Sequence, residues 1–170
     1  MRLEGSCHCG AVRFTLRSRH PYPFNLCYCS ICRKTAGGGG YAINLGGDHA
    51  SLEVVGREHV RVYHARIRAP GEAPGSGEAK AEESPAERNF CGICASCLWL
   101  WDPRWPDLVH PFASAIDSPL PKAPERTHLM LASKAPWVEP AIGPNDRQFA
   151  GYPDESISDW HERLGLVDDD

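Results

Sequence analysis

Eight cysteines in three clusters are the residues of this chain that could carry out the most specific chemistry. Cysteines two or three residues apart in a turn can direct both sulfurs at one metal ion, whereas a disulfide across so short a span strains its torsion angle. The N-terminal residues contain no apolar run typical of an export signal, so we expect a compartment that keeps thiols reduced. The clusters therefore predict zinc ligands rather than a disulfide framework. The cysteines are Cys7, Cys9, Cys27, Cys29, Cys32, Cys91, Cys94 and Cys97.

The spacing of the cysteines divides them between two sites. A closed zinc site needs four ligands, and two short pairs from distant parts of a chain commonly supply them. Cys7 and Cys9 together with Cys91 and Cys94 fit this pattern. Such a site would join an N-terminal strand to a turn far along the chain, and metal–ligand energy would offset the entropy of closing that loop. We expect one structural zinc ion here.

The remaining close-set group, Cys27, Cys29 and Cys32, offers three thiolates to a second ion. Three protein ligands leave one coordination position open for water or substrate, and this ion is expected to be the more labile one. Three thiolates also donate much negative charge, so the zinc would be a weak Lewis acid. The group favours binding of a substrate thiol over activation of a carbonyl.

Cys97 leaves three alternatives open. It could be a fourth ligand that closes the second site, a thiol poised to pair with Cys94, or a small buried residue beside a strand at Leu98 and Trp99. If it closed the second site, no position would be vacant and an enzymatic interpretation would weaken.

No catalytic acid or base is predicted, because the sequence brings no titratable side chain to the proposed open site. Arg33 and Lys34 could meet a carboxylate of a substrate, and the backbone of Gly37 to Gly40 could approach a ligand closely; a solvated turn and a flexible linker explain them equally well. The side chains that qualify as acids or bases by type alone are Tyr28, Asp48, His49 and Asp117.

The elements that would position these residues are mainly short strands. In Ala11–Leu16 the apolar residues alternate with polar ones, which indicates a half-buried strand. Helix is predicted at Ser30–Ala36 and at Ser156–Leu164, where Ser156 and Asp159 make a plausible cap. Further strands are predicted at Tyr41–Leu45, Leu52–Val55, His59–Tyr63, Leu98–Trp101, Val109–Ile116 and Thr127–Ala132.

Length and composition predict one domain over residues 1–170, because 170 residues with 42% hydrophobic content can bury one core. Residues 68–88 are rich in Pro, Gly and Glu and lack apolar periodicity, so we expect a mobile surface insertion there. The net charge of −4, without a basic stretch, makes nucleic acid and anionic membranes poor partners. No segment has the apolar length of a membrane span, so we expect a cytoplasmic protein.

Four segments resemble the glutathione-dependent formaldehyde-activating enzyme family, also called the centromere protein V family, which has the Mss4-like fold. Gly5-Ser-Cys-His-Cys-Gly-Ala-Val-Arg-Phe14 is similar to the opening strand of that family, and Cys27-Tyr-Cys-Ser-Ile-Cys-Arg-Lys34 to its second cysteine segment. Phe90-Cys-Gly-Ile-Cys94 resembles the second half of its structural site, and the segment from His128 to Trp137 its late strand and loop.

This resemblance implies a mainly β fold of small antiparallel sheets closed by the four-cysteine zinc site, with Cys27, Cys29 and Cys32 near the substrate. It implies a zinc-dependent carbon–sulfur lyase that acts on the adduct of a thiol and an aldehyde, such as glutathione and formaldehyde, with a small-molecule thiol as partner. The chain departs from the family pattern at Ala95, where the family usually has Gly, and in having Cys97. The alternatives are a zinc-stabilised protein-binding module and a redox sensor.

Overall fold

The computed structural model describes residues 1–36, 38–67 and 82–168. The helices are α1 (Ser30–Thr35) and α2 (Ile157–Leu164), with short 3-10 turns at His49–Ser51, Arg57–His59, Ala113–Ala115 and Leu131–Ser133. The strands are β1 (Arg2–Ser6), β2 (Arg13–Arg17), β3 (Asn25–Cys27), β4 (Ala42–Ile43), β5 (Gly47–Asp48), β6 (Glu53–Val55), β7 (Val60–Ile67), β8 (Glu82–Cys91), β9 (Cys97–Trp101), β10 (Leu108–Pro111), β11 (Thr127–Leu129) and β12 (Arg147–Gln148).

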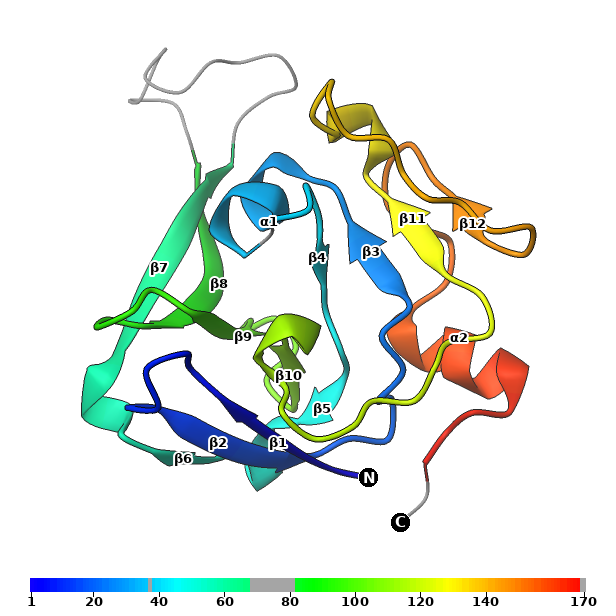
Figure 1. Cartoon of the computed structure of the whole chain (residues 1–170). Coiled ribbons are helices and arrows are strands. Elements are labelled where there is room, and N and C mark those ends of the chain that lie inside the picture. Colours follow the sequence, from blue (N-terminus) through cyan, green and yellow to red (C-terminus); the bar gives the residue numbers. More distant parts are fainter. Residues whose placement is uncertain (37, 68–81, 169–170) are drawn as a thin grey trace.

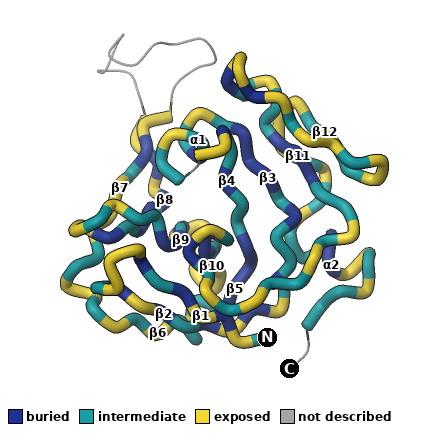
Figure 2. The backbone as a smooth tube through the Cα atoms, viewed as in Figure 1, coloured by how far each residue is buried: buried dark blue, intermediate teal, exposed yellow. Residues whose placement is uncertain are grey.

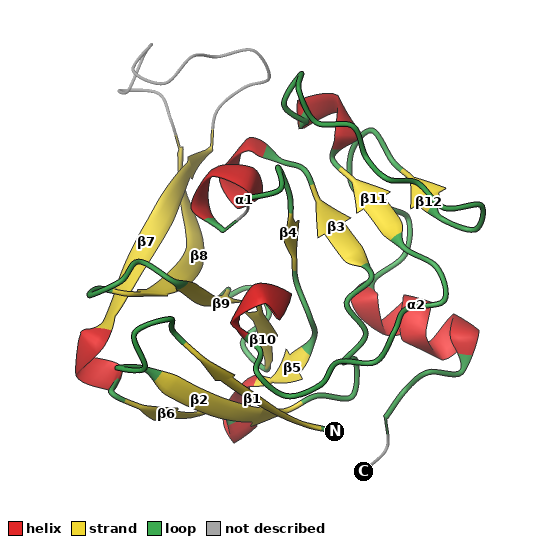
Figure 3. Ribbon diagram, in the orientation of Figure 1, coloured by secondary structure: helices red, strands yellow, loops and turns green. Residues whose placement is uncertain are grey.

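Three sheets form from the described strands (Figures 1 and 3). Two are antiparallel throughout, in the orders β1-β2-β6 and β5-β10-β9-β8-β7. The third has the order β12-β11-β3-β4, in which β11 runs parallel to both β12 and β3. The mainly β architecture with antiparallel sheets and a short C-terminal helix is thus confirmed, and the parallel pairs are an addition to it. The assignment of the whole chain to one domain stays a prediction.

The core lies where the sheets face one another, along the inner sides of the strands (Figure 2). Leu3, Phe14 and Leu16 alternate inward from β1 and β2 and meet Trp99 and Val109 from the five-stranded sheet. The rings of Phe14 and Trp99 contact edge to face, with centroids 5.2 Å apart. A second buried cluster contains cysteine side chains packed with Ala42, Phe112 and Leu129. Both cysteine-rich regions are therefore built into the core.

The predicted insertion at 68–88 is wrong over its last residues. Residues 82–88 belong to β8, which pairs with both β7 and β9. Alternate side chains of this segment, Ser84, Ala86 and Arg88, are buried. Because the inward residues are small or charged, the segment shows no apolar periodicity although it is a sheet strand. Residues 68–81 lie outside the described part of the chain.

Other predicted elements form with shifted ends. The expected strand at His59–Tyr63 extends to Ile67 in β7. The expected strand at Val109–Ile116 ends at Pro111, since a 3-10 turn begins at Ala113. The expected strand at Thr127–Ala132 ends at Leu129, because Met130 takes a left-handed conformation with φ 61°.

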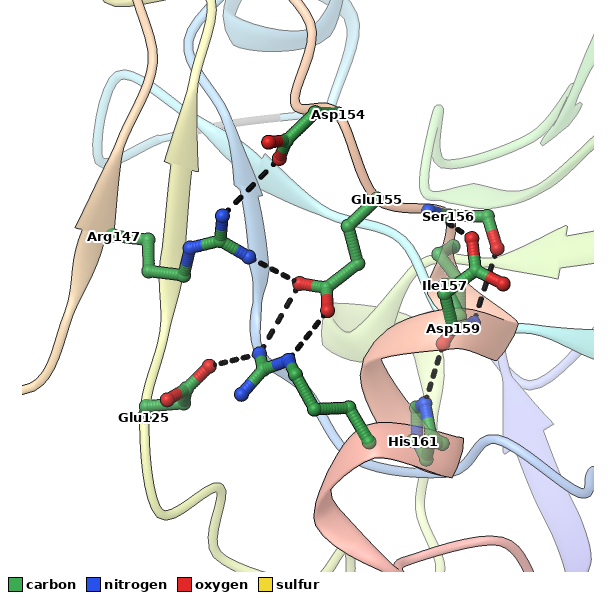
Figure 4. Close-up of polar contacts among 9 residues, drawn as sticks. Glu125, Arg147, Asp154, Glu155, Ser156, Ile157, Asp159 and His161 are labelled. Atoms are coloured by element: carbon green, nitrogen blue, oxygen red, sulfur yellow. Dashed lines mark hydrogen bonds and ion pairs between the residues drawn. The ribbon is translucent and has the colours of Figure 1, made fainter.

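The C-terminal helix is fixed by its cap and by ion pairs. The predicted cap at Ser156 is confirmed as a capping box, in which Ser156 and Asp159 each accept a backbone N–H from the other. Glu155 accepts from Arg147 at 2.7 Å and from Arg163 at 2.6 Å, which ties α2 to β12 (Figure 4).

His161 is the most deeply buried titratable group of α2. Its side chain is 0% exposed, and its Nδ1 lies 2.8 Å from the carbonyl oxygen of Ile157 (Figure 4). Its Nε2 accepts the N–H of Tyr22. The stacked rings of Phe24 and Trp160 pack against it. Burial lowers the pKa of His161 to about 4, so the imidazole is neutral in the folded chain.

The turn between β8 and β9 contains a strained residue. Ala95 has φ 61°, and its N–H donates to the carbonyl oxygen of Cys91 at 2.8 Å. A side chain in this left-handed conformation meets its own backbone, whereas glycine adopts the conformation freely. The structure thus gives the physical reason why the family pattern has Gly at this position.

We predict that Ala95→Gly stabilises the fold. Removing the β-carbon relieves the left-handed strain, and the free energy of unfolding should rise by about 1 kcal/mol. Urea unfolding of the purified protein measures it. Ala50→Gly, at an exposed position of the 3-10 turn His49–Ser51, is the matched control and should destabilise by about 0.5–1 kcal/mol. Equal losses in the two variants would contradict the interpretation.

We also predict that acid weakens the fold through His161. The unfolded histidine has the ordinary pKa of 6.5 and the folded one about 4, so the unfolded state binds more protons between these values. The free energy of unfolding should therefore fall as pH drops from 6.5 to 4, by up to about 3 kcal/mol. His161→Gln should be less stable at pH 7.5 and show a shallower fall in urea titrations at several pH values. An unchanged slope would assign the acid sensitivity to other groups.

Candidate metal centres

Four cysteines from two turns meet in the first cluster. Cys7 and Cys9 lie in the turn between β1 and β2, and Cys91 and Cys94 lie at the turn between β8 and β9. The four sulfurs lie within 4.8 Å of one another, with Cys7 and Cys9 separated by 3.5 Å and Cys9 and Cys91 by 3.8 Å. A tetrahedron with metal–sulfur bonds of about 2.3 Å has an edge of about 3.8 Å, whereas a disulfide joins sulfurs at about 2.05 Å. All eight cysteines are free, so the cluster could hold one metal ion with four ligands.

Hydrogen bonds from the chain support the sulfurs of this cluster. The backbone N–H of Val12 donates to Cys7 Sγ at 3.2 Å. The Ser96 hydroxyl contacts Cys94 Sγ at 3.3 Å and accepts the N–H of His8, which joins the two turns. Hydrogen bonds from Ser96 lower the pKa of Cys94 to about 5. This sulfur is thus prepared to act as a thiolate.

Three cysteines form the second cluster at the start of α1. Cys27 ends β3, Cys29 is the N-cap of α1, and Cys32 lies inside the helix. The Cys29 sulfur accepts the N–H of Cys32 at 3.3 Å, in the position where a serine or aspartate oxygen usually caps a helix. All three sulfurs lie within 4.8 Å of one another. The cap thus directs the chain so that one sulfur before the helix and one within it meet.

The second cluster is open. Across the described residues, no further histidine, cysteine or carboxylate joins this group of three. Because tetrahedral coordination needs four ligands, an ion held here would have one position for an outside ligand. Hydrogen bonds from Cys27 and Cys32 lower the pKa of Cys29 to about 2, while the contacts with Cys29 raise the pKa of Cys27 and of Cys32. The group therefore carries negative charge.

Cys97 is not part of either group. It packs against the second cluster, but its thiol donates to the carbonyl oxygen of Thr35 at the end of α1. Burial raises the pKa of Cys97, which keeps the proton on the sulfur. Of the three sequence-based alternatives, the structure shows the small, half-buried residue, which lies at the start of β9. It shows neither a fourth ligand nor a disulfide with Cys94.

Arg88 is a site residue that the sequence analysis missed. Its side chain is 8% exposed, and one guanidinium nitrogen donates to Cys32 Sγ at 3.7 Å. The other terminal nitrogen lies 3.4 Å from Thr35 Oγ1. The signal in the sequence was the alternation from Ser84 to Arg88, which is weak because its inward residues are small or charged.

A buried polar network holds the other face of the cysteine segment. Tyr28, between Cys27 and Cys29, places its hydroxyl 2.9 Å from His128 Nδ1, and His128 Nε2 lies 3.3 Å from Asp146 Oδ2. Burial raises the pKa of Asp146, but hydrogen bonds from Arg126 and the backbone outweigh this and lower it overall. Burial raises the pKa of Tyr28 to about 12. The Tyr28 side chain therefore packs in the core, where its hydroxyl contacts His128, and does not point at the sulfurs of the second cluster.

The other residues considered as acids or bases do not join the clusters. Asp48 caps a 3-10 turn, and His49 Nδ1 lies 3.0 Å from the carbonyl oxygen of Pro106. Asp117 lines a cleft of about 570 Å³ together with Cys97, Thr35 and Ser96. This lining does not include the three cysteines of the second cluster.

The segment before α2 approaches the buried apolar cluster that contains Cys27 and Cys32. The carbonyl oxygen of Gly151 accepts the N–H of Met130 at 2.8 Å, and Met130 packs against that cluster. Tyr152 follows Gly151, but its side chain is 80% exposed. Desolvation and the negative charges of the three cysteines raise the pKa of its phenol. The phenol is therefore protonated near neutral pH and is not a residue of the buried cluster.

The basic and glycine residues after the second cluster have different surroundings. The buried Nε of Arg33 has no hydrogen-bond partner among the described residues, and Lys34 is exposed. A β-carbon on Gly40, whose φ is 85°, would lie 2.4 Å from a methyl group of Val138. Gly40 is thus required by packing, while Gly37 lies outside the described residues.

No helix in the described ranges is long and apolar enough to cross a membrane.

Comparisons with known proteins give the family of the chain. The model of the family described as "Glutathione-dependent formaldehyde-activating enzyme" matches residues 2–132. A protein of Halomonas elongata, named "Putative glutathione-dependent formaldehyde-activating enzyme", is 64% identical over 166 residues, which cover 98% of each chain. The crystal structure of a Rhodobacter sphaeroides protein matches 71% of this chain and 92% of its own at 24% identity, with a TM-score of 0.50, and supports the fold. The matched family segment includes both cysteine clusters and Arg88, and the chain belongs to the glutathione-dependent formaldehyde-activating enzyme family.

Proposed function

We propose that this protein is a zinc-dependent enzyme that joins a thiol to formaldehyde, with glutathione as the thiol, or that cleaves the resulting adduct. This chemistry makes or breaks one carbon–sulfur bond, so the enzyme would belong to the carbon–sulfur lyases. The observation that carries the proposal is the group Cys27, Cys29 and Cys32 with its open fourth position, in a chain that belongs to this family. The proposed location is the cytoplasm, where thiols stay reduced.

The two clusters have different proposed roles. Cys7, Cys9, Cys91 and Cys94 would hold a structural zinc ion, because four sulfurs complete a tetrahedron and leave no place for substrate. Cys27, Cys29 and Cys32 would hold a second, more labile zinc ion. That ion supplies a positive charge that lowers the pKa of a bound thiol, so that the substrate reacts as a thiolate.

Arg33, which follows the last cysteine of the second cluster, supports binding of an acidic thiol. It has a buried guanidinium nitrogen without a partner among the described residues, which suits a substrate carboxylate such as those of glutathione. When the thiolate sulfur adds to the carbonyl carbon, the C=O pair becomes an alkoxide that must gain a proton. Water at the site can supply that proton.

Removal of one ligand should separate the two sites. Wild-type protein purified without chelator should contain two zinc ions and lose one to a mild chelator. Cys29→Ser should contain one ion and lose more than about 100-fold of the activity, because the site keeps only two sulfurs while serine preserves the cap of α1. Elemental analysis and an assay of adduct formation from glutathione and formaldehyde measure both effects.

The same experiment distinguishes the enzyme from a binding module. Two ions that both resist the chelator, or one ion throughout with no adduct formed, would favour a protein with purely structural metal. In that case Cys29→Ser would change stability and not an activity.

Replacement of Cys97 tests whether the second site is open. Cys97→Ser keeps a hydroxyl donor for the Thr35 carbonyl, so two zinc ions and wild-type activity are expected. Cys94→Ser, which removes a sulfur of the four-cysteine cluster, is the control that should disturb metal binding and folding. Loss of the labile ion in Cys97→Ser would mean that Cys97 is a fourth ligand after all.

A further inference from the structure

Arg88 is a buried cation without a carboxylate partner among the described residues. Other arginines of the described chain pair with acids at short range, as in the 2.6 Å contact of Arg104 with Asp102 and the 2.7 Å contact of Arg126 with Asp146. Within the described residues, none of the ion pairs includes Arg88, although its side chain is only 8% exposed. A buried charge is costly unless an opposite charge compensates it. The structure must supply that negative charge in another form.

Arg88 contacts one of the three sulfurs of the second cluster. One guanidinium nitrogen donates to Cys32 Sγ at 3.7 Å, and such a bond is strongest when the sulfur is an anion. Cys97, the other sulfur close to Arg88, keeps its proton on the bond to the Thr35 carbonyl. Arg88 therefore lies against three sulfurs that would become thiolates when they bind a divalent ion.

The charges of the site follow from these contacts. A divalent ion with three thiolates has a net charge of about −1, and the guanidinium brings the group to neutrality. A substrate thiolate in the fourth position would bring the metal group to about −2 without Arg88, and Arg88 reduces this to about −1. A cation at this place thus helps the binding of an anionic ligand more than the binding of water.

We propose that Arg88 is a positioning residue that neutralises the three-thiolate site and so allows it to accept a thiolate as its fourth ligand. This inference rests on the proposed function of the second cluster. It concerns a fixed charge, because an arginine stays protonated at any pH at which the protein is folded.

The surroundings of Arg88 favour arginine over lysine. Its two terminal nitrogens contact Cys32 Sγ and Thr35 Oγ1, and the Thr35 hydroxyl in turn donates to the carbonyl oxygen of Ile31 at 2.8 Å. A planar fork can make both contacts at once, whereas an ammonium group is a single point charge. The residue lies on β8, between β7 and β9, so its backbone is held by hydrogen bonds on both sides.

The test compares Arg88→Gln, Arg88→Lys and Arg66→Met in the full-length zinc-loaded protein. Glutamine keeps N–H donors and loses the charge, lysine keeps the charge, and Arg66 is an exposed cation on the adjacent strand β7. Chelator competition measures zinc affinity at each site, and calorimetry measures the affinity for glutathione and for S-methylglutathione, which has no free thiol. The four-cysteine site is an internal control for folding.

We expect Arg88→Gln to lower the zinc affinity of the three-cysteine site about 10–100-fold and to lower glutathione affinity as well, while the four-cysteine site is unchanged. S-methylglutathione should bind the variants and the wild type alike. Arg88→Lys should restore much of the glutathione affinity, and Arg66→Met should match the wild type. A residue needed only for packing would not be rescued by lysine.

Two other outcomes are distinguishable. If the wild type holds one zinc ion and binds no glutathione, the proposed function fails before Arg88 is tested. If the wild type holds two ions and binds glutathione but Arg88→Gln does so equally well, the role of Arg88 is overturned. Loss of metal from both sites in Arg88→Gln, with no rescue in Arg88→Lys, would likewise assign Arg88 to folding alone.

Discussion

The meeting of two distant turns at four sulfurs is the constraint on which the rest of the fold depends. The turn after β1 contributes Cys7 and Cys9, and the turn after β8 contributes Cys91 and Cys94. The strands that enter and leave these turns belong to different sheets. Fixing the turns therefore fixes how the three-stranded sheet packs on the five-stranded one, and the aromatic contact between Phe14 and Trp99 lies between those two sheets.

The second cluster depends on that packing in a different way. Its three sulfurs come from one short segment, so the metal itself would close no long loop. What places the segment is the core around it, with β3 paired to β4 and β11 and Tyr28 bonded to His128 on the far face. Because strand side chains alternate, one segment can point two sulfurs to one side and a phenol to the other. The site can thus stay formed while its ion exchanges.

The sequence predicted what local spacing controls and missed what distant contacts control. The close-set cysteines, the β class and the cap at Ser156 follow from residues a few positions apart, and such patterns are visible in one chain. Arg88 reaches Cys32 across 56 positions, and Tyr28 reaches His128 across 100. Neither pair produces a periodic pattern in the sequence. The parallel pairing of β3 with β11 was hidden for the same reason.

Burial explains why two groups of sulfurs in one small fold could have different chemistry. In the four-cysteine cluster Cys7 and Cys91 are buried, but Cys9 is exposed and Cys94 half-buried, so water can solvate part of the negative charge there. In the second cluster Cys27 and Cys32 are buried, so the charge must be met by a protein group, and Arg88 occupies that place. A complete sulfur tetrahedron near water suits a structural ion. An incomplete one beside a buried cation suits the binding of an anion from outside, and this asymmetry follows from where the chain buries its thiols.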